Sequence, residues 1–209
     1  MINSLHFTED QRDYLQEICN IGMGQAGKSL SVLFEQYVTL SIPAIEVIHS
    51  NDLVSALRKL IPENEVSAVR QGFSANANKA KFSGESLTIF SNTSFNDLAQ
   101  LLAFDEEITP SFEQETLLEI SNIINGACLN GIAEQLSEQF FHTPPSLIGQ
   151  SISVENLLDK QQVSWEHALS IKIEYRVEKY AFQCALLLLL PDTSITYLQI
   201  ILDKLLDEL

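Results

Sequence analysis

Apolar residues recur along the chain with two different periods, which predict long helices alternating with strands. Thr8, followed by Gln11 three positions later, is typical of a capping box, and Thr109 followed by Pro110 is typical of a second helix start. Apolar residues follow both caps at helical spacing. They are Leu15, Ile18, Ile21, Leu30, Leu33 and Phe34 in the first segment, and Leu117, Leu118, Ile120, Ile123 and Ile124 in the second. Gly22 and Gly24 either break the first helix or let another backbone approach it closely.

The segments between and after these helices are shorter. Strands are predicted at 38–48, 66–75, 80–90, 146–154, 168–177 and 180–190. Further helices are predicted at 52–60, 94–104, 155–160 and 194–209. Pro43 lies inside the first strand, which predicts an edge strand or a bulge because proline cannot donate to a ladder. Each half of the chain therefore has the order α-β-α-β-β-α.

Three residue types recur at a fixed separation of 102 positions, which indicates an internal duplication. The matched pairs are Glu17 with Glu119, Asn20 with Asn122, and Pro43 with Pro145. We expect residues 1–209 to form a single domain of two repeats, at about 1–106 and 107–209. The expected fold class is α+β, with a pseudo-twofold axis and long helices packed on one continuous, mostly antiparallel sheet.

The charge balance excludes several classes of function. Twelve basic residues against 28 acidic ones give a net charge of −16, which repels phosphate backbones and anionic lipids. We therefore expect no nucleic-acid partner and no membrane insertion, since the longest apolar run, 185–190, is too short to cross a bilayer. The polar, acidic N-terminal sequence and three widely separated cysteines favour a cytoplasmic location. No histidine or cysteine spacing is typical of a metal site, so we expect no metal.

Glu17 and Asn20 are three positions apart on the first helix and should project from one face, away from the apolar stripe. Asp13 lies four positions before Glu17, as Glu115 lies before Glu119 in the second copy. Asparagine is a poor residue for a helix interior, so its repeated placement there favours a functional role. The alternative is that these side chains only form a solvated surface and that the two prolines only mark strand edges.

The doubled pattern resembles the signature of the CheC-type phosphatases of bacterial chemotaxis, which are relatives of CheX and FliY. That signature is (Asp or Ser)-x3-Glu-x2-Asn-x22-Pro. The chain carries it as Asp13, Glu17, Asn20 and Pro43, and again as Glu115, Glu119, Asn122 and Pro145. Glu115 stands where the family has Asp or Ser. The resemblance extends over nearly the whole chain and implies a CheC-like fold.

The resemblance implies that the protein dephosphorylates the aspartyl phosphate of a CheY-type response regulator. Asn20 and Asn122 would orient the attacking water, and Glu17 and Glu119 would pair with the regulator's active-site lysine. The resemblance implies no cofactor in this chain, because Mg²⁺ is held by the partner regulator. A CheD-type deamidase is a second candidate partner.

Two alternatives of other classes remain open at this point. One is a non-catalytic adaptor that binds CheY or a CheD-type deamidase, and the other is a structural scaffold like the flagellar switch proteins. The family resemblance implies that switch proteins with this fold lack the Glu and Asn pair. The presence of the pair in both halves therefore favours the phosphatase.

Overall fold

The computed structural model describes residues 6–75, 82–91, 94–157 and 166–208. The elements of the first half are α1 (Glu9–Phe34), β1 (Thr39–Leu40), β2 (Ala44–His49), η1 (Ser50–Asp52), α2 (Leu53–Leu60), β3 (Glu65–Ser74), β4 (Ser83–Ser91) and α3 (Phe95–Leu101). Those of the second half are α4 (Pro110–Gln135), β5 (Phe141–His142), β6 (Ser146–Ser153), η2 (Val154–Asn156), β7 (His167–Val177), β8 (Phe182–Pro191) and α5 (Asp192–Asp207).

The two long helices begin where the sequence predicts. Thr8 and Gln11 form both hydrogen bonds of a capping box, and the Thr109 hydroxyl accepts from the Phe112 N–H at 3.2 Å. Helix α1 runs for 26 residues without interruption, so Gly22 and Gly24 do not break it. The structure instead shows a close approach of another backbone at Gly22, which was the other possibility for these glycines.

Two shorter helices differ from their predicted extents. Helix α3 ends at Leu101, because Ala103 takes a left-handed φ of 50° and the Phe104 N–H turns back to the Ala99 carbonyl at 2.8 Å. The segment predicted as a helix at 155–160 begins as the short 3-10 helix η2, and its residues 158–160 lie outside the described part of the chain. The segment that joins the strands predicted at 66–75 and 80–90 also lies outside the described residues.

The strands form one antiparallel sheet that draws on both halves of the chain. The order is β1-β7-β8-β4-β3-β5, with β2 also paired to β7 and β6 also paired to β3. The edge strands of each half therefore pair with a central strand of the other half. This exchange makes the sheet continuous, and it confirms the predicted fold class.

The pairing register obeys a pseudo-twofold relation. At the centre, Leu87 of β4 lies opposite Leu187 of β8, its counterpart 100 residues later. At the edges, Thr39 lies opposite Arg176 and Phe141 lies opposite Ser74. Adding 102 to Thr39 gives position 141, and subtracting 102 from Arg176 gives position 74. The two edges are thus built with the same register.

Pro43 and Pro145 each follow a two-residue strand at the sheet edge, as the edge prediction required. In the first copy the Ser41 hydroxyl accepts from the Glu174 N–H at 3.0 Å, and in the second the Thr143 hydroxyl accepts from the Gly72 N–H at 2.9 Å. At each proline, the hydroxyl two residues earlier therefore accepts a hydrogen bond from a backbone N–H of the neighbouring strand, at the point where the edge strand is interrupted. The prolines mark matched breaks in the two edge strands.

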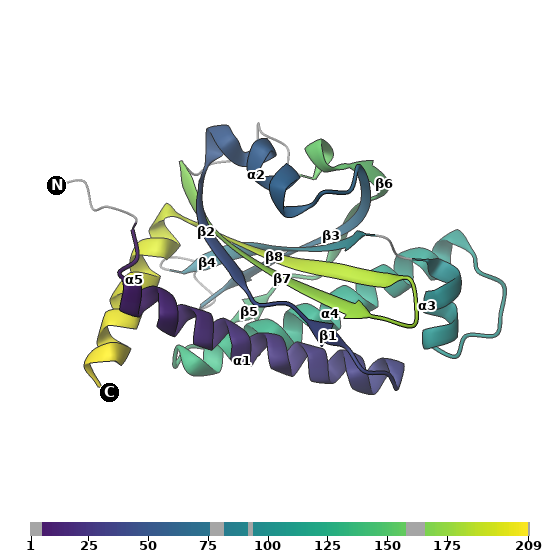
Figure 1. The fold of residues 1–209 in the computed structure, drawn as a ribbon, viewed down its shortest axis with the longest axis horizontal. Coiled ribbons are helices and arrows are strands. Elements are labelled where there is room, and N and C mark those ends of the chain that lie inside the picture. The colour runs from purple at the N-terminus through teal and green to yellow at the C-terminus, as the bar shows by residue number, and fades with distance from the viewer. Residues whose placement is uncertain (1–5, 76–81, 92–93, 158–165, 209) are drawn as a thin grey trace.

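Both faces of the sheet are covered (Figure 1). Helices α1 and α4 pack along each other on one face, and the short helix α2 lies on the other. The larger core cluster includes Leu186, Leu188 and Leu190 of β8, whereas the smaller cluster contains Leu187 and Leu189. Because alternate side chains of a strand point to opposite faces, a continuous leucine run suits a strand that is buried on both sides.

Glycines bring α1 and α4 into backbone contact. A Cβ built on Gly22 would lie 2.6 Å from the Cys128 carbonyl oxygen, and one on Gly131 would lie 2.8 Å from the Gly22 Cα. Any side chain at Gly22 would therefore push the two helices apart. The helices that carry the repeated motif are held together by this contact.

Candidate functional site

The motif residues of the first copy lie on the outer face of α1. Leu15 and Ile18 are buried, whereas Asp13 and Glu17 are exposed and Asn20 is half-buried. Spacings of four and three residues keep these polar side chains on one helix face. Within the described residues, neither Glu17 nor Asn20 makes a side-chain hydrogen bond or an ion pair. Their polar atoms are therefore available to a partner.

The second copy on α4 is arranged in the same way. Glu115, Glu119 and Asn122 are exposed, and Thr116, Leu117 and Ile120 point into the core. Among the described residues, Glu119 and Asn122 also lack side-chain partners. Glu115 differs from its counterpart Asp13, because its carboxylate accepts a hydrogen bond from the Ser111 hydroxyl at 2.8 Å. This local bond restrains Glu115.

Each asparagine is followed four positions later by a glycine on the same helix face. Gly24 is exposed and Gly126 is half-buried, and a Cβ built on either would meet no atom within 4 Å. A glycine in a helix interior costs about 1 kcal/mol relative to alanine. Within the described structure no packing contact explains either glycine. The two glycines leave bare backbone next to Asn20 and Asn122.

The motif side chains at this surface can bind and orient a partner. A carboxamide donates through its NH₂ group and accepts through its oxygen, and a carboxylate accepts from a cation. The thiols cannot serve as nucleophiles, because Cys19, Cys128 and Cys184 are fully buried and burial raises the pKa of each, to about 12 for Cys128. Pro43 and Pro145 contribute no donor, and they shape the sheet edge.

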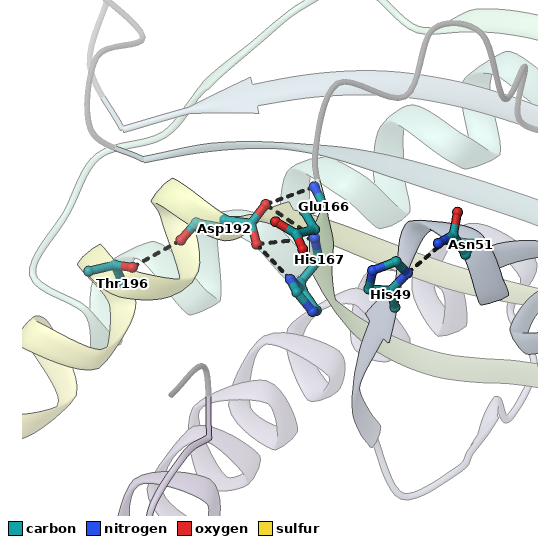
Figure 2. Close-up of polar contacts among 6 residues, drawn as sticks. All are labelled: His49, Asn51, Glu166, His167, Asp192 and Thr196. Carbon is teal, nitrogen blue, oxygen red and sulfur yellow. Dashed lines mark hydrogen bonds and ion pairs between the residues drawn. The ribbon is translucent and has the colours of Figure 1, made fainter. Parts of the chain in front are cut away.

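A second polar cluster lies elsewhere, and sequence reasoning missed it. His49, Glu166 and His167 each offer a side-chain ligand atom, and these atoms all lie within 4.8 Å of one another. Figure 2 shows the group together with Asp192, at the end of β2 and the start of β7. His49 and His167 are 118 positions apart in the sequence (167 − 49), so no local spacing could have signalled the cluster.

The fold matches chemotaxis and flagellar proteins of known structure. FliY from Thermotoga maritima is 14% identical, with a TM-score of 0.71 over 98% of this chain and 99% of that one. FliM from H. pylori, in a complex with SpeE, is 12% identical, with a TM-score of 0.62 over 95% and 97%. CheX from Desulfovibrio desulfuricans is 16% identical, with a TM-score of 0.55 over 83% and 99%.

These matches define the fold of the chain. The chain has the CheC-like fold shared by CheX, FliY and FliM, as the sequence resemblance implied. No protein-family model matches the sequence. Among the helices that the structure describes, none combines the length and the apolar character needed to cross a bilayer.

Proposed function

We propose that the protein is a phosphatase that acts on the aspartyl phosphate of a CheY-type response regulator in the cytoplasm. The observation that carries this proposal is the doubled Glu and Asn pair at the helix surface, without partners in the described structure, beside an open glycine on both α1 and α4. Solvated polar residues alone would not require an unpacked glycine at the same place in both copies.

Asn20 and Asn122 would orient the attacking water. An aspartyl phosphate is an activated acyl phosphate, and the regulator's own Mg²⁺ neutralises its charge, so the phosphatase has only to place a water in line. The side-chain oxygen of asparagine can accept from that water while its NH₂ donates to a phosphoryl oxygen. In such a mechanism this chain supplies no nucleophile and no metal.

Glu17 and Glu119 would dock the regulator. Each is exposed on the same helix face as its asparagine, one turn earlier. A carboxylate that pairs with a lysine of the partner fixes the orientation of docking, and partial desolvation of the pair strengthens it. The net charge of −16 favours a partner with a basic rim around its phosphorylation site.

Gly24 and Gly126 would leave room for the regulator. Insertion of a short carboxamide into a phosphate pocket requires that the surrounding loops approach the helix closely. A side chain one turn beyond each asparagine would hold those loops away. The open space above both glycines supports this role.

A non-catalytic adaptor is the second candidate, and the similarity to FliM favours it. FliM in its complex with SpeE matches 95% of this chain. An adaptor would bind a regulator or a CheD-type deamidase through the same helix faces without hydrolysis. Asn20 and Asn122 distinguish the two candidates, because only the phosphatase needs them for turnover.

The deciding experiment follows the decay of a phosphorylated CheY-type regulator from the same organism, with and without this protein. Asn20→Ala, Asn122→Ala and the double variant are compared with Asn130→Ala, an exposed asparagine on the same α4 helix. The control matches the change in helix propensity. Binding to a beryllofluoride-activated regulator is measured in parallel.

We expect the protein to accelerate decay, each single variant to keep part of the rate, and the double variant to fall to the regulator's own rate. With one site silenced, loss of the remaining asparagine should lower the rate by roughly 10²-fold while binding persists. Binding without acceleration would support the adaptor. Complete loss in one single variant would refute two independent sites.

A further inference from the structure

The side chains of His49, Glu166 and His167 meet at one corner of the sheet, away from the helix faces described above. His49 ends β2 and lies directly opposite His167, which begins β7. Their ring centroids are 4.9 Å apart and the ring planes are nearly perpendicular, at 86°. Both rings are half-buried and Glu166 is exposed, so an ion from solvent can reach the group.

His167 is held in the orientation and tautomer that a metal ligand needs. Its Nδ1 lies 3.2 Å from the Asp192 Oδ1, and Asp192 also accepts from the backbone N–H of Glu166 and of His167. A carboxylate only accepts, so Nδ1 of His167 carries a proton, and in the neutral ring the lone pair then lies on Nε2. Metal-binding histidines in proteins commonly have such a carboxylate behind them.

His49 can supply the second nitrogen through Nε2. Its Nδ1 accepts from the Asn51 N–H at 3.0 Å, and its ring lies between Asn51 and His167 (Figure 2). Metal binding at Nε2 places the ring proton on Nδ1, so the Asn51 bond is lost. This exchange opposes binding and should make the site weaker than a closed structural zinc site.

We propose that His49, His167 and Glu166 form a binding site for a late first-row divalent metal ion such as Zn²⁺. Two imidazoles and one carboxylate suit Zn²⁺, and three protein ligands leave a coordination position open to water. The bound ion would tie the β2–β7 edge to the N-terminus of α5 through Asp192. The expectation of no metal was based on the local spacing of histidines and cysteines. Local spacing cannot reveal a pair of ligands that lie 118 positions apart in the sequence (167 − 49).

The cluster joins the two halves of the chain, and its residue types do not recur at the pseudo-symmetric positions of the other sheet edge. The positions 102 residues away from His49 and His167 hold Ser151 and Glu65. The position equivalent to Glu166 is Asn64. These three residues provide no imidazole. The site is therefore independent of the duplicated Glu and Asn motif, and the proposed phosphatase does not depend on it.

The test uses untagged full-length protein, dialysed against EDTA and titrated with Zn²⁺ in calorimetry, with Co²⁺ absorption as a second probe. The variants His49→Gln and His167→Gln remove one ligand each, and Asp192→Asn alters the group that orients His167. His6→Gln is the matched control outside the cluster. The three cysteines are fully buried and should not compete for the metal.

We expect one Zn²⁺ per chain, weakened at least tenfold by either ligand variant, weakened roughly 10–100-fold by Asp192→Asn, and unchanged in His6→Gln. Imidazole NMR of the wild-type protein needs no variant: Zn²⁺ should shift the signals of His49 and His167 and leave those of His6 and His142 in place. Absence of stoichiometric binding would overturn the proposal, as would shifts at His6 or His142 alone.

Discussion

Two glycines two positions apart on α1 should respond in opposite ways to alanine. Gly22 faces α4, where its added Cβ would lie 2.6 Å from the Cys128 carbonyl oxygen and 2.8 Å from the Ile132 Cγ1. Gly24 faces open space. Gly22→Ala and Gly24→Ala each add one methyl group to the same helix, so each serves as the control for the other.

The magnitudes follow from propensity and packing. Gly24→Ala gains helix propensity alone, so the free energy of unfolding should rise by about 1 kcal/mol. Gly22→Ala makes the same gain but overpacks the helix interface, which costs about 1–3 kcal/mol. The clash is with a backbone oxygen that cannot rotate away, so the upper end of that range applies. We expect a net loss of about 1–2 kcal/mol.

Thermal unfolding followed by circular dichroism measures both effects. For a chain of this size, 1 kcal/mol corresponds to about 2–4 °C in Tm, so Gly24→Ala should raise Tm by about 2–4 °C and Gly22→Ala should lower it by about 2–8 °C. If Gly22→Ala raised Tm as Gly24→Ala does, the close contact of α1 and α4 would be wrong. The proposed docking surface makes a further prediction, that the more stable Gly24→Ala protein dephosphorylates the regulator less well at the first site.

Two further predictions concern charge and pH. With the second site silenced, Glu17→Gln should chiefly raise KM and flatten the dependence of KM on salt. The reason is that the carboxylate would pair with the regulator in both the ground state and the transition state. An unchanged salt dependence in stopped-flow assays would argue against docking through Glu17. Burial lowers the pKa of His142, whose ring nitrogens have no partner in the described structure, so the unfolded chain takes up the proton more readily as pH falls below about 6.5. Stability should therefore decline as the pH falls through about 6.5, and His142→Gln should reduce that decline in Tm. An equal decline in the variant would contradict the assignment to His142.

Local signals in the sequence sufficed for most elements. Caps at Thr8 and Thr109 determined where α1 and α4 begin, because a capping side chain bonds to backbone only three residues away. The matched pairs at a fixed separation indicated the duplication before any strand pairing was known. The exposure of Glu17 followed from helical spacing alone, since the apolar stripe had to face the core, whereas Asn20 on the same face is half-buried.

Other features depended on contacts between residues far apart in the chain. Neither glycine in the Gly22-Met23-Gly24 segment could be assigned to packing or to an open surface until α4 was placed beside α1. The exchange of edge strands between halves also required the sheet, because strand order depends on which distant edges meet.

The sequence by itself therefore determined where the two long helices begin, most of the strands and the polar face of each long helix. Tertiary structure alone decided which strands pair and which glycine is buried, and it alone brought His49 beside His167. The physical reason is range: capping and periodicity act within a few residues, whereas a ladder register joins positions that local pattern does not relate.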